Sequence, residues 1–310
     1  MYPNAPGKQE NNPIIQLMFL GLFAILGLIV FAIAACIIVY LLYGLDTLMA
    51  VLSNQLNEKN VGAFKIILTS QQLGLFLTPA ILLAVVERKP LNKFYGFKTP
   101  KPNLLFMAAF IGLCSLPFLS WVNELNQKMS LPSFLKNVEN WMRAMETDLA
   151  KTTEIILKTS SGWGLIINLL VIAVTPAICE EFIFRGGLQR SIFRLVVNPH
   201  VAIWLSAIIF SCIHFQFFGF FTRMFLGATF GYLYFWTGSI WYAVFAHFLN
   251  NAYAVIVAYY YQSKNLPLNE SDMQSVPLYM SILSAILTVS LLLFIKKKAS
   301  QSNIPQPYEN

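Results

Sequence analysis

Charged residues are scarce in this chain. Only 11% of its 310 residues are Asp, Glu, Lys or Arg, whereas 57% are hydrophobic, and the mean hydropathy is +0.61. A soluble globular domain carries about 25% charged residues, so this composition excludes an ordinary soluble domain. The sequence therefore predicts an integral, multi-pass membrane protein, which we expect in a bacterial cytoplasmic membrane.

Cysteine and histidine are also rare. The four cysteines have no CxxC spacing, which argues against a disulfide framework or a zinc knuckle. We expect small packing residues at Cys36, Cys114, Cys179 and Cys212, although nucleophilic catalysis by Cys179 or Cys212 is an alternative. Of the three histidines, His200 adjoins a proline at a helix start, where a capping or interfacial role is expected.

Long uncharged runs dominate the remaining sequence. Apolar segments of roughly 20 residues, the length that crosses a bilayer as a helix, recur about eight times. We place them at 14–44, 62–87, 104–124, 163–185, 200–217, 219–236, 239–261 and 277–295. The first run exceeds the core of a signal peptide, which is about 7–15 residues long, so we expect it to be retained as a helix. The predicted fold class is all-α, with about eight transmembrane helices.

The basic residues gather in short segments after the second, fourth and last predicted spans. Lys and Arg concentrate on the cytoplasmic side of membrane proteins, and with eight spans all three segments fall on one side. This pattern predicts that both termini are cytoplasmic. It also explains the net charge of +7 by membrane anchoring, and no nucleic-acid recognition motif is present. The residues are Arg88, Lys89, Lys93, Lys98, Lys101, Arg190, Arg194, Lys296, Lys297 and Lys298.

The connection between the third and fourth spans differs in composition from its surroundings. It mixes basic and acidic residues, and apolar residues recur in it at helical spacing around Trp141, which predicts an interfacial amphipathic helix. A lid over a substrate entrance is one role for this segment, and a solvated connector is the role we favour. The expected parts of the chain are a polar tail (1–13), N-terminal spans (14–124), the connector (125–161), a catalytic core (162–261), and the last span with a basic tail (262–310).

Two adjacent glutamates, Glu180 and Glu181, stand inside an apolar stretch and are followed by Arg185. Ionisable residues at membrane depth are costly and mark functional sites by default. Glu181 and Arg185 are spaced for an ion pair within one helix turn, while Glu180 projects about 100° away from Glu181. The three charges indicate either a catalytic site or a packing network near a helix end.

Two histidines and an asparagine follow within later spans. His247 and Asn251 are four residues apart and share a helical face. If the hairpin between the fourth and fifth spans turns at 194–199, Glu180 lies 14 residues before the turn and His214 lies 15 after it. Each would then be roughly 21–23 Å from the turn, so we expect both at the same membrane depth.

This set of side chains has the chemistry for hydrolysis. Glu180 and His214 could polarise a water for attack on a carbonyl group, and His247 and Asn251 could donate hydrogen bonds to the developing oxyanion. Two imidazoles and a carboxylate also form a common zinc set. No HExxH motif is present, and Asn251 is a better hydrogen-bond donor than zinc ligand, so we favour a site without a cofactor and keep zinc as the alternative.

The ordered motifs resemble those of the CAAX protease and bacteriocin-processing family of intramembrane endopeptidases. The resemblance covers about residues 165 to 260 and includes the flank Phe184-Arg185-Gly186, whereas the N-terminal half matches no motif. No motif position departs from the family pattern. The motifs are Glu180-Glu181-x-x-x-Arg185, Phe210-x-x-x-His214 and His247-x-x-x-Asn251.

The resemblance implies an all-helical membrane core with a catalytic cavity inside the bilayer. It implies that Glu180 and His214 activate water, that His247 and Asn251 form the oxyanion site, and that Glu181 and Arg185 support them. Members related to the eukaryotic enzymes cleave the last three residues from prenylated proteins, and many bacterial members act in peptide or bacteriocin processing, immunity or signalling. We therefore expect an endopeptidase for a hydrophobic or lipidated peptide or protein.

Two readings without peptidase activity compete with this one. A proton-coupled transporter could place the same ionisable residues along a proton path, but no inverted repeat is evident. A membrane scaffold or immunity protein could bind a partner helix, but no motif residue is lost.

Overall fold

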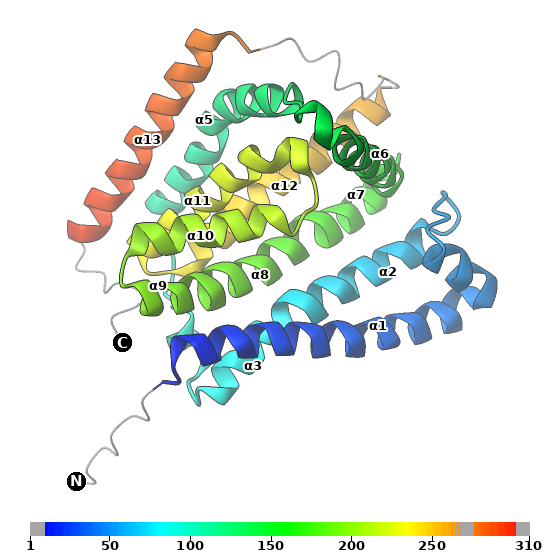
Figure 1. Ribbon diagram of the computed structural model, residues 1–310, viewed down its shortest axis with the longest axis horizontal. Coiled ribbons are helices and arrows are strands. Elements are labelled where there is room, and N and C mark those ends of the chain that lie inside the picture. The colour runs from blue at the N-terminus through cyan, green and yellow to red at the C-terminus, as the bar shows by residue number, and fades with distance from the viewer. Residues whose placement is uncertain (1–9, 265, 267–275, 302–310) are drawn as a thin grey trace.

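A computed structural model describes residues 10–264, 266 and 276–301, and within them the regular structure is helical (Figure 1). Residues 1–9 of the expected polar tail (1–13), and residues 265, 267–275 and 302–310 of the expected last segment (262–310), lie outside the described residues. The α-helices are α1 Pro13–Leu52, α2 Val61–Gln72, α3 Thr78–Val86, α4 Leu91–Phe94, α5 Pro102–Gln127, α6 Lys136–Leu157, α7 Gly162–Asn168, α8 Thr175–Glu181, α9 Arg190–Val196, α10 Pro199–Cys212, α11 Phe220–Thr237, α12 Ile240–Ser263 and α13 Leu278–Gln301. The π-helical turns are η1 Leu73–Leu77, η3 Leu169–Val174 and η4 Phe182–Gln189, and the 3-10 turns are η2 Ser133–Leu135 and η5 Phe217–Gly219.

Six helices in the described part of the chain are long and apolar enough to cross a membrane. They span 13–52, 61–86, 102–127, 162–196, 240–263 and 278–300. The all-α, polytopic fold is confirmed, but the number of eight spans is not. The apolar helix α10 has only 14 residues because the chain turns after Cys212, and α11 is not among the six because Arg223 and several polar aromatic residues lower its hydropathy.

Local sequence signals explain where several helices begin and end. Proline occupies the first position of α1, α5 and α10, where its missing N–H costs nothing. The Asn12 and Asn198 side chains accept hydrogen bonds from the first-turn N–H groups of Ile14 and His200 at 2.9 and 3.0 Å, as N-caps do. Gly238 ends α11 in the left-handed conformation, with φ of 62°.

Two of the long helices contain a Thr-Pro pair directly after a π-helical turn. Proline lacks the N–H that would bond the carbonyl group four residues earlier, so that carbonyl group loses its usual backbone partner and the helix widens locally. In Thr78-Pro79 and Thr175-Pro176 the threonine hydroxyl donates to the carbonyl oxygen five residues before it, Leu73 at 2.9 Å and Leu170 at 2.8 Å. Wide turns of this kind often accompany functional sites, and here η1 and η3 flank the buried glutamates.

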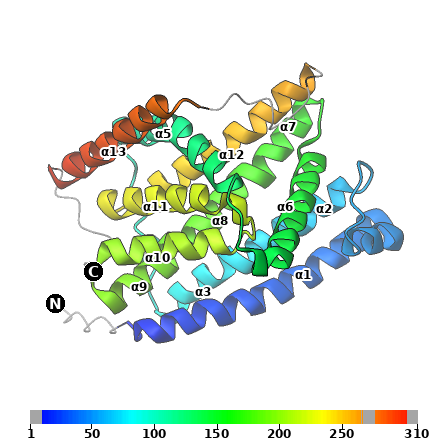
Figure 2. The same ribbon diagram turned by 45° about the horizontal axis from the view of Figure 1, so that its top comes forward.

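The helix 162–196 passes through the middle of the molecule. On one side of it α1 packs along α2, η1 and α3, and on the other side lie α10, α11 and α12. In both ribbon views α13 lies alongside α5 at the edge (Figures 1 and 2). The glutamates at the end of α8 are therefore surrounded by helices from both halves of the chain.

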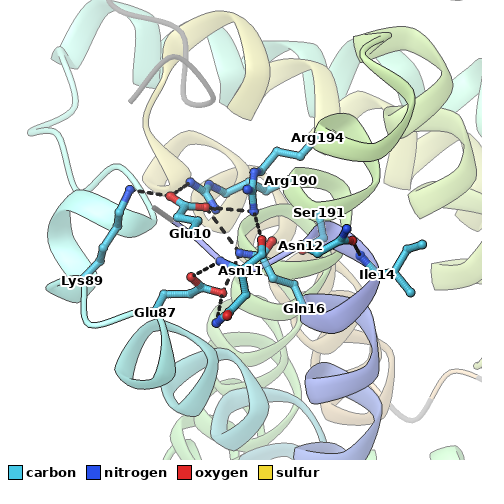
Figure 3. Close-up of polar contacts among 10 residues, drawn as sticks. All are labelled: Glu10, Asn11, Asn12, Ile14, Gln16, Glu87, Lys89, Arg190, Ser191 and Arg194. Atoms are coloured by element: carbon cyan, nitrogen blue, oxygen red, sulfur yellow. Dashed lines mark hydrogen bonds and ion pairs between the residues drawn. The ribbon is translucent and has the colours of Figure 1, made fainter. Parts of the chain in front are cut away.

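Glu10, three residues before the start of α1, ties the first helices to the end of the central one. The Glu10 carboxylate forms ion pairs with Lys89 at 2.5 Å, Arg190 at 2.5 Å and Arg194 at 3.1 Å (Figure 3). Burial raises the pKa of Glu10, but the hydrogen bonds and charges of Arg190 and Lys89 outweigh it and lower the pKa to about 2. The basic segments after the second and fourth predicted spans thus meet at one end of the bundle, whereas a cytoplasmic location for that end stays a prediction.

Helix α6 lies in the connector, where the amphipathic helix was expected, and it contacts the segment that follows His214. The rings of Trp141 and Phe217 are 5.6 Å apart, and the Arg143 guanidinium lies 4.0 Å from the centre of the Phe218 ring. The Glu146 carboxylate accepts a hydrogen bond from the Phe218 N–H at 3.3 Å. One face of α6 therefore packs against the segment that follows His214.

Candidate active site

The three charged residues of the first motif are buried in the central helix. Glu180 and Glu181 end α8, Arg185 follows in η4, and their exposed fractions are 4%, 0% and 1%. A buried charge is stable only when it is paired and hydrogen-bonded, so their partners decide what the site can do.

Glu181 joins Arg185 to His247. Its Oε2 atom lies 3.0 Å from Arg185 Nε, which is the ion pair predicted from the spacing, and its Oε1 atom lies 2.8 Å from His247 Nδ1. Arg185 also donates from Nη2 to the carbonyl oxygen of Gly227 at 2.8 Å. These contacts fix the orientation of the His247 ring.

Glu180 faces both motif histidines. Its Oε2 atom lies 3.9 Å from Nε2 of His214 and 3.9 Å from Nε2 of His247. This distance is too long for a direct hydrogen bond but suits a bridge through one water molecule. The other oxygen, Oε1, accepts a hydrogen bond from Gln72 Nε2 at 3.1 Å, a contact that the sequence did not predict.

The ring hydrogen bonds determine how each histidine can act. His214 Nδ1 lies 2.7 Å from the carbonyl oxygen of Phe210, and His247 Nδ1 lies 2.8 Å from the Glu181 carboxylate. Because both partners only accept hydrogen bonds, each Nδ1 atom must carry a hydrogen. The Nε2 atoms are then the ones that face Glu180, and neutral His214 presents an acceptor there.

Asn251 is held beside the same site by the backbone of η3. Its Nδ2 atom donates to the carbonyl oxygen of Ile172 at 3.3 Å, and that carbonyl is four residues before Pro176, which cannot bond it. Within the described part of the chain, Asn251 makes no hydrogen bond to Glu180 or to either histidine. The structure thus brings five of the six predicted residues into one polar cluster and places Asn251 on the same helix as His247, one turn away.

Aromatic rings enclose the charged cluster. The Phe230 ring is stacked on His247 at 5.1 Å between centres, and Phe210 meets His247 edge-on at 6.0 Å. The Arg185 guanidinium lies 4.9 Å from the centre of Phe210 and 5.6 Å from that of Phe230. Such rings stabilise a buried cation and keep the surroundings weakly polar, which strengthens electrostatic interactions inside the site.

Two sequence expectations need correction or comment. His214 was expected inside a helix, but α10 ends at Cys212 and His214 lies in the turn that follows, before Phe215 with its positive φ of 52°. His200 lies in the first turn of α10 and contacts the Tyr232 hydroxyl at 2.8 Å, which agrees with its omission from the site.

Neither a metal nor a thiol mechanism gains support from geometry. Among the described residues, no group of three or more His, Cys, Asp or Glu side chains is arranged to hold a metal ion. A site without a cofactor stays a prediction, and zinc stays its alternative. Cys179 is buried and Cys212 is exposed, and both are free cysteines.

One region of the chain matches a model of a known protein family. Residues 162–253 match the family model described as type II CAAX prenyl endopeptidase Rce1-like. No curated protein and no solved structure matches the chain. The matched region contains all six predicted site residues and leaves helices α1 to α6 outside it. The resemblance drawn from the three motifs is confirmed, because residues 162–253 are similar to the Rce1-like intramembrane peptidases.

Proposed function

We propose that the protein is a glutamate-type intramembrane endopeptidase, in which Glu180 and His214 activate the water that hydrolyses a peptide bond. The observation that carries this proposal is the position of Glu180 Oε2, 3.9 Å from Nε2 of each motif histidine in a buried site. A carboxylate and an imidazole acceptor at this separation can both accept hydrogen bonds from one water molecule.

The attack on the substrate then follows in two steps. Glu180 takes a proton from the water as the oxygen bonds to the substrate carbonyl carbon, which gives a tetrahedral intermediate with a negative oxygen. When the carbon–nitrogen bond breaks, Glu180 returns the proton to the leaving amine. The products are a carboxylic acid and an amine, and no covalent enzyme intermediate forms.

The oxyanion needs hydrogen-bond donors. His247 already uses Nδ1–H for Glu181, so we propose that both ring nitrogens carry a hydrogen when Nε2 acts as a donor. With His247 in this form, two buried carboxylates, Glu180 and Glu181, face two buried cations, Arg185 and His247, and the charges balance. Asn251 has a second amide hydrogen beyond the one donated to Ile172.

An apolar cavity supports a hydrophobic substrate. A space of about 300 Å³ between α5, α11 and α12 is lined by apolar side chains such as Leu226 and Leu249. Its wall includes Phe230, which stacks on His247, and Asn250, which donates to Asn251 at 3.3 Å. A side chain or lipid anchor in this cavity would place a neighbouring peptide bond near the polar cluster, so we propose a hydrophobic or lipidated peptide as the substrate.

For the orientation, we infer that the end of the bundle that carries Glu10, Lys89, Arg190 and Arg194 faces the cytoplasm. Basic residues prefer the cytoplasmic side of a membrane, and because these residues meet at one end of the bundle, they all indicate the same side for that end.

Cleavage of a fluorogenic peptide panel tests the proposal. Purified wild type and Glu180→Gln would be assayed in detergent with farnesylated CAAX peptides and unmodified hydrophobic peptides, each with and without a chelator. We expect cleavage by the wild type that survives chelation and disappears in Glu180→Gln. Loss with the chelator and rescue by zinc would overturn the metal-free mechanism, and equal activity of both proteins would overturn the assignment of Glu180. The best peptide defines the substrate class.

A further inference from the structure

Gln72 reaches the proposed catalytic carboxylate from outside the region matched by the family model. It is the last residue of α2, and its Nε2 atom donates to Glu180 Oε1 at 3.1 Å. The two residues are 108 positions apart in the chain. The contact therefore links the N-terminal helices to the centre of the matched region.

The hydrogen bond separates the roles of the two carboxylate oxygens. A carboxylate only accepts hydrogen bonds, so the Gln72 amide must present its NH₂ group to Oε1. The other oxygen, Oε2, is then left to face Nε2 of His214 and His247. A donor bound to one oxygen also fixes rotation of the carboxyl group, which sets where the activated water can lie.

The backbone around Gln72 is held closely in place. Two residues after it, in η1, Gly74 contacts Gly27 of α1 so tightly that a Cβ atom on Gly27 would lie 2.2 Å from the Gly74 carbonyl oxygen. The same α1 is tied to α9 through Glu10 and Arg190 (Figure 3). Gln72 therefore approaches Glu180 from a helix pair that is fixed at two points.

We propose that Gln72 is a positioning residue for Glu180, and that the N-terminal helices complete the active site in this way. The inference rests on the proposed function, because it assigns Gln72 a task in the activation of water. The amide oxygen of Gln72 is buried and accepts no hydrogen bond from the described residues, so it adds an acceptor for an N–H group or a water at the same place.

The test replaces the donor without changing the length of the side chain. Gln72→Met removes the hydrogen bond, and the matched control is Gln71→Met, because Gln71 precedes Gln72 on the same helix and is exposed. A hydrogen bond to a charged group corresponds to roughly a tenfold or larger change in rate. We expect kcat on the best peptide to fall about tenfold or more in Gln72→Met with little change in KM, and both to stay at wild-type values in Gln71→Met.

A second readout does not depend on peptidase activity. Dicyclohexylcarbodiimide labels protonated carboxyl groups, and mass spectrometry can compare labelling at Glu180 with labelling at Glu181 in the same peptide. In the wild type the Gln72 amide group occupies Oε1 of Glu180, so its removal leaves that oxygen open to the reagent. We expect the ratio of Glu180 to Glu181 labelling to rise several-fold in Gln72→Met and to stay constant in Gln71→Met.

The outcomes separate the two proposals. Wild-type activity with equal kcat and equal labelling in both variants would overturn the role of Gln72 and leave the peptidase proposal intact. A wild type that is no more active than Glu180→Gln would overturn the peptidase proposal, and the labelling ratio would then decide alone whether Gln72 controls the Glu180 carboxyl group. A mutant with a lower kcat but unchanged labelling would contradict the positioning role, because a general loss of structure would explain it.

Discussion

One carboxylate, that of Glu181, holds His247 at 2.8 Å through Oε1 and Arg185 at 3.0 Å through Oε2. All three side chains are almost fully buried, with exposed fractions of 4% or less. The Glu181 carboxylate thus links Arg185 to His247 and fixes the orientation of the His247 ring. The ion pair of Glu181 and Arg185 is therefore in direct contact with the proposed catalytic residue His247.

This arrangement predicts different effects for single and paired substitutions. Arg185→Met leaves the Glu181 carboxylate in the interior without its cation, which should cost about 3–5 kcal/mol of stability. The double variant Glu181→Leu/Arg185→Met removes both charges and should recover much of that loss. It should still lack peptidase activity, because His247 Nδ1 has lost its acceptor. Thermal unfolding in detergent and the peptide assay measure the two effects, and a stable double variant with wild-type activity would contradict the role given to Glu181.

Gly186 is predicted to be intolerant of a side chain. A Cβ atom there would lie 2.3 Å from Cδ1 of the buried Tyr95 ring. Gly186→Ala should therefore destabilise the protein by about 1–3 kcal/mol, the usual cost of overpacking.

The control for this variant is Gly112→Ala, because a Cβ atom at Gly112 in α5 meets nothing within 4 Å. That substitution should be neutral or stabilise by up to about 1 kcal/mol through helix propensity. The thermal midpoints of both variants in detergent provide the comparison. Equal changes in the two midpoints would contradict the predicted clash between a Gly186 side chain and Tyr95.

Glu10 gives the protein a pH-dependent contribution to stability. Its pKa is lowered from an ordinary value of 4.5 to about 2 in the folded protein, so the unfolded state binds the proton more readily. The contribution of Glu10 is fully present above about pH 4.5 and is lost as the pH falls toward 2.

The measurement is thermal unfolding of the wild type and Glu10→Gln between pH 3 and pH 7. The variant should be less stable at neutral pH by about 1–3 kcal/mol, because three cations lose a charged partner, and the difference should shrink at the acidic end. Glu58→Gln is the control, since Glu58 forms an exposed ion pair with Lys158. A constant difference across the pH range would contradict the ion-pair account.

Helix α6 is predicted to support the segment that carries His214. Arg143 stacks on Phe218 and also donates to Glu139 at 2.9 Å, so its removal should loosen the turn next to His214. Arg143→Ala should lower kcat about three- to tenfold with a small change in the thermal midpoint. Lys151→Ala, on the exposed part of α6, should behave as the wild type. Similar kcat values for both variants would mean that α6 is only a connector.

Several features of the fold and site were predictable because they follow from simple periodicity. Apolar run lengths predicted an all-helical, multi-pass membrane protein, although not the number of spans, and the spacing of Glu181 and Arg185 predicted their ion pair. Counting residues on both sides of the turn predicted that Glu180 and His214 would lie at the same depth. In the structure, Glu180 Oε2 lies 3.9 Å from His214 Nε2.

Other features depended on three-dimensional packing. Gln71 and Gln72 are adjacent polar residues in one apolar helix, and only the packing of α2 against α8 distinguishes the half-buried Gln72 from the exposed Gln71. A proline inside an apolar run indicates a disturbed helix, but it does not reveal that the carbonyl oxygen of Ile172 accepts a hydrogen bond from Asn251. The length of α10 was overestimated because apolar residues continue past Cys212 into the turn.

Single-turnover cleavage by Glu180→Gln tests the central claim most directly. The best peptide would be mixed with excess enzyme in the presence of a chelator, with Glu124→Gln as the matched control because Glu124 pairs with Lys128 away from the site. The account predicts that Glu180→Gln is slower than the wild type by about a hundredfold or more, and that Glu124→Gln keeps the wild-type rate. A Glu180→Gln rate equal to that of the wild type would contradict the account.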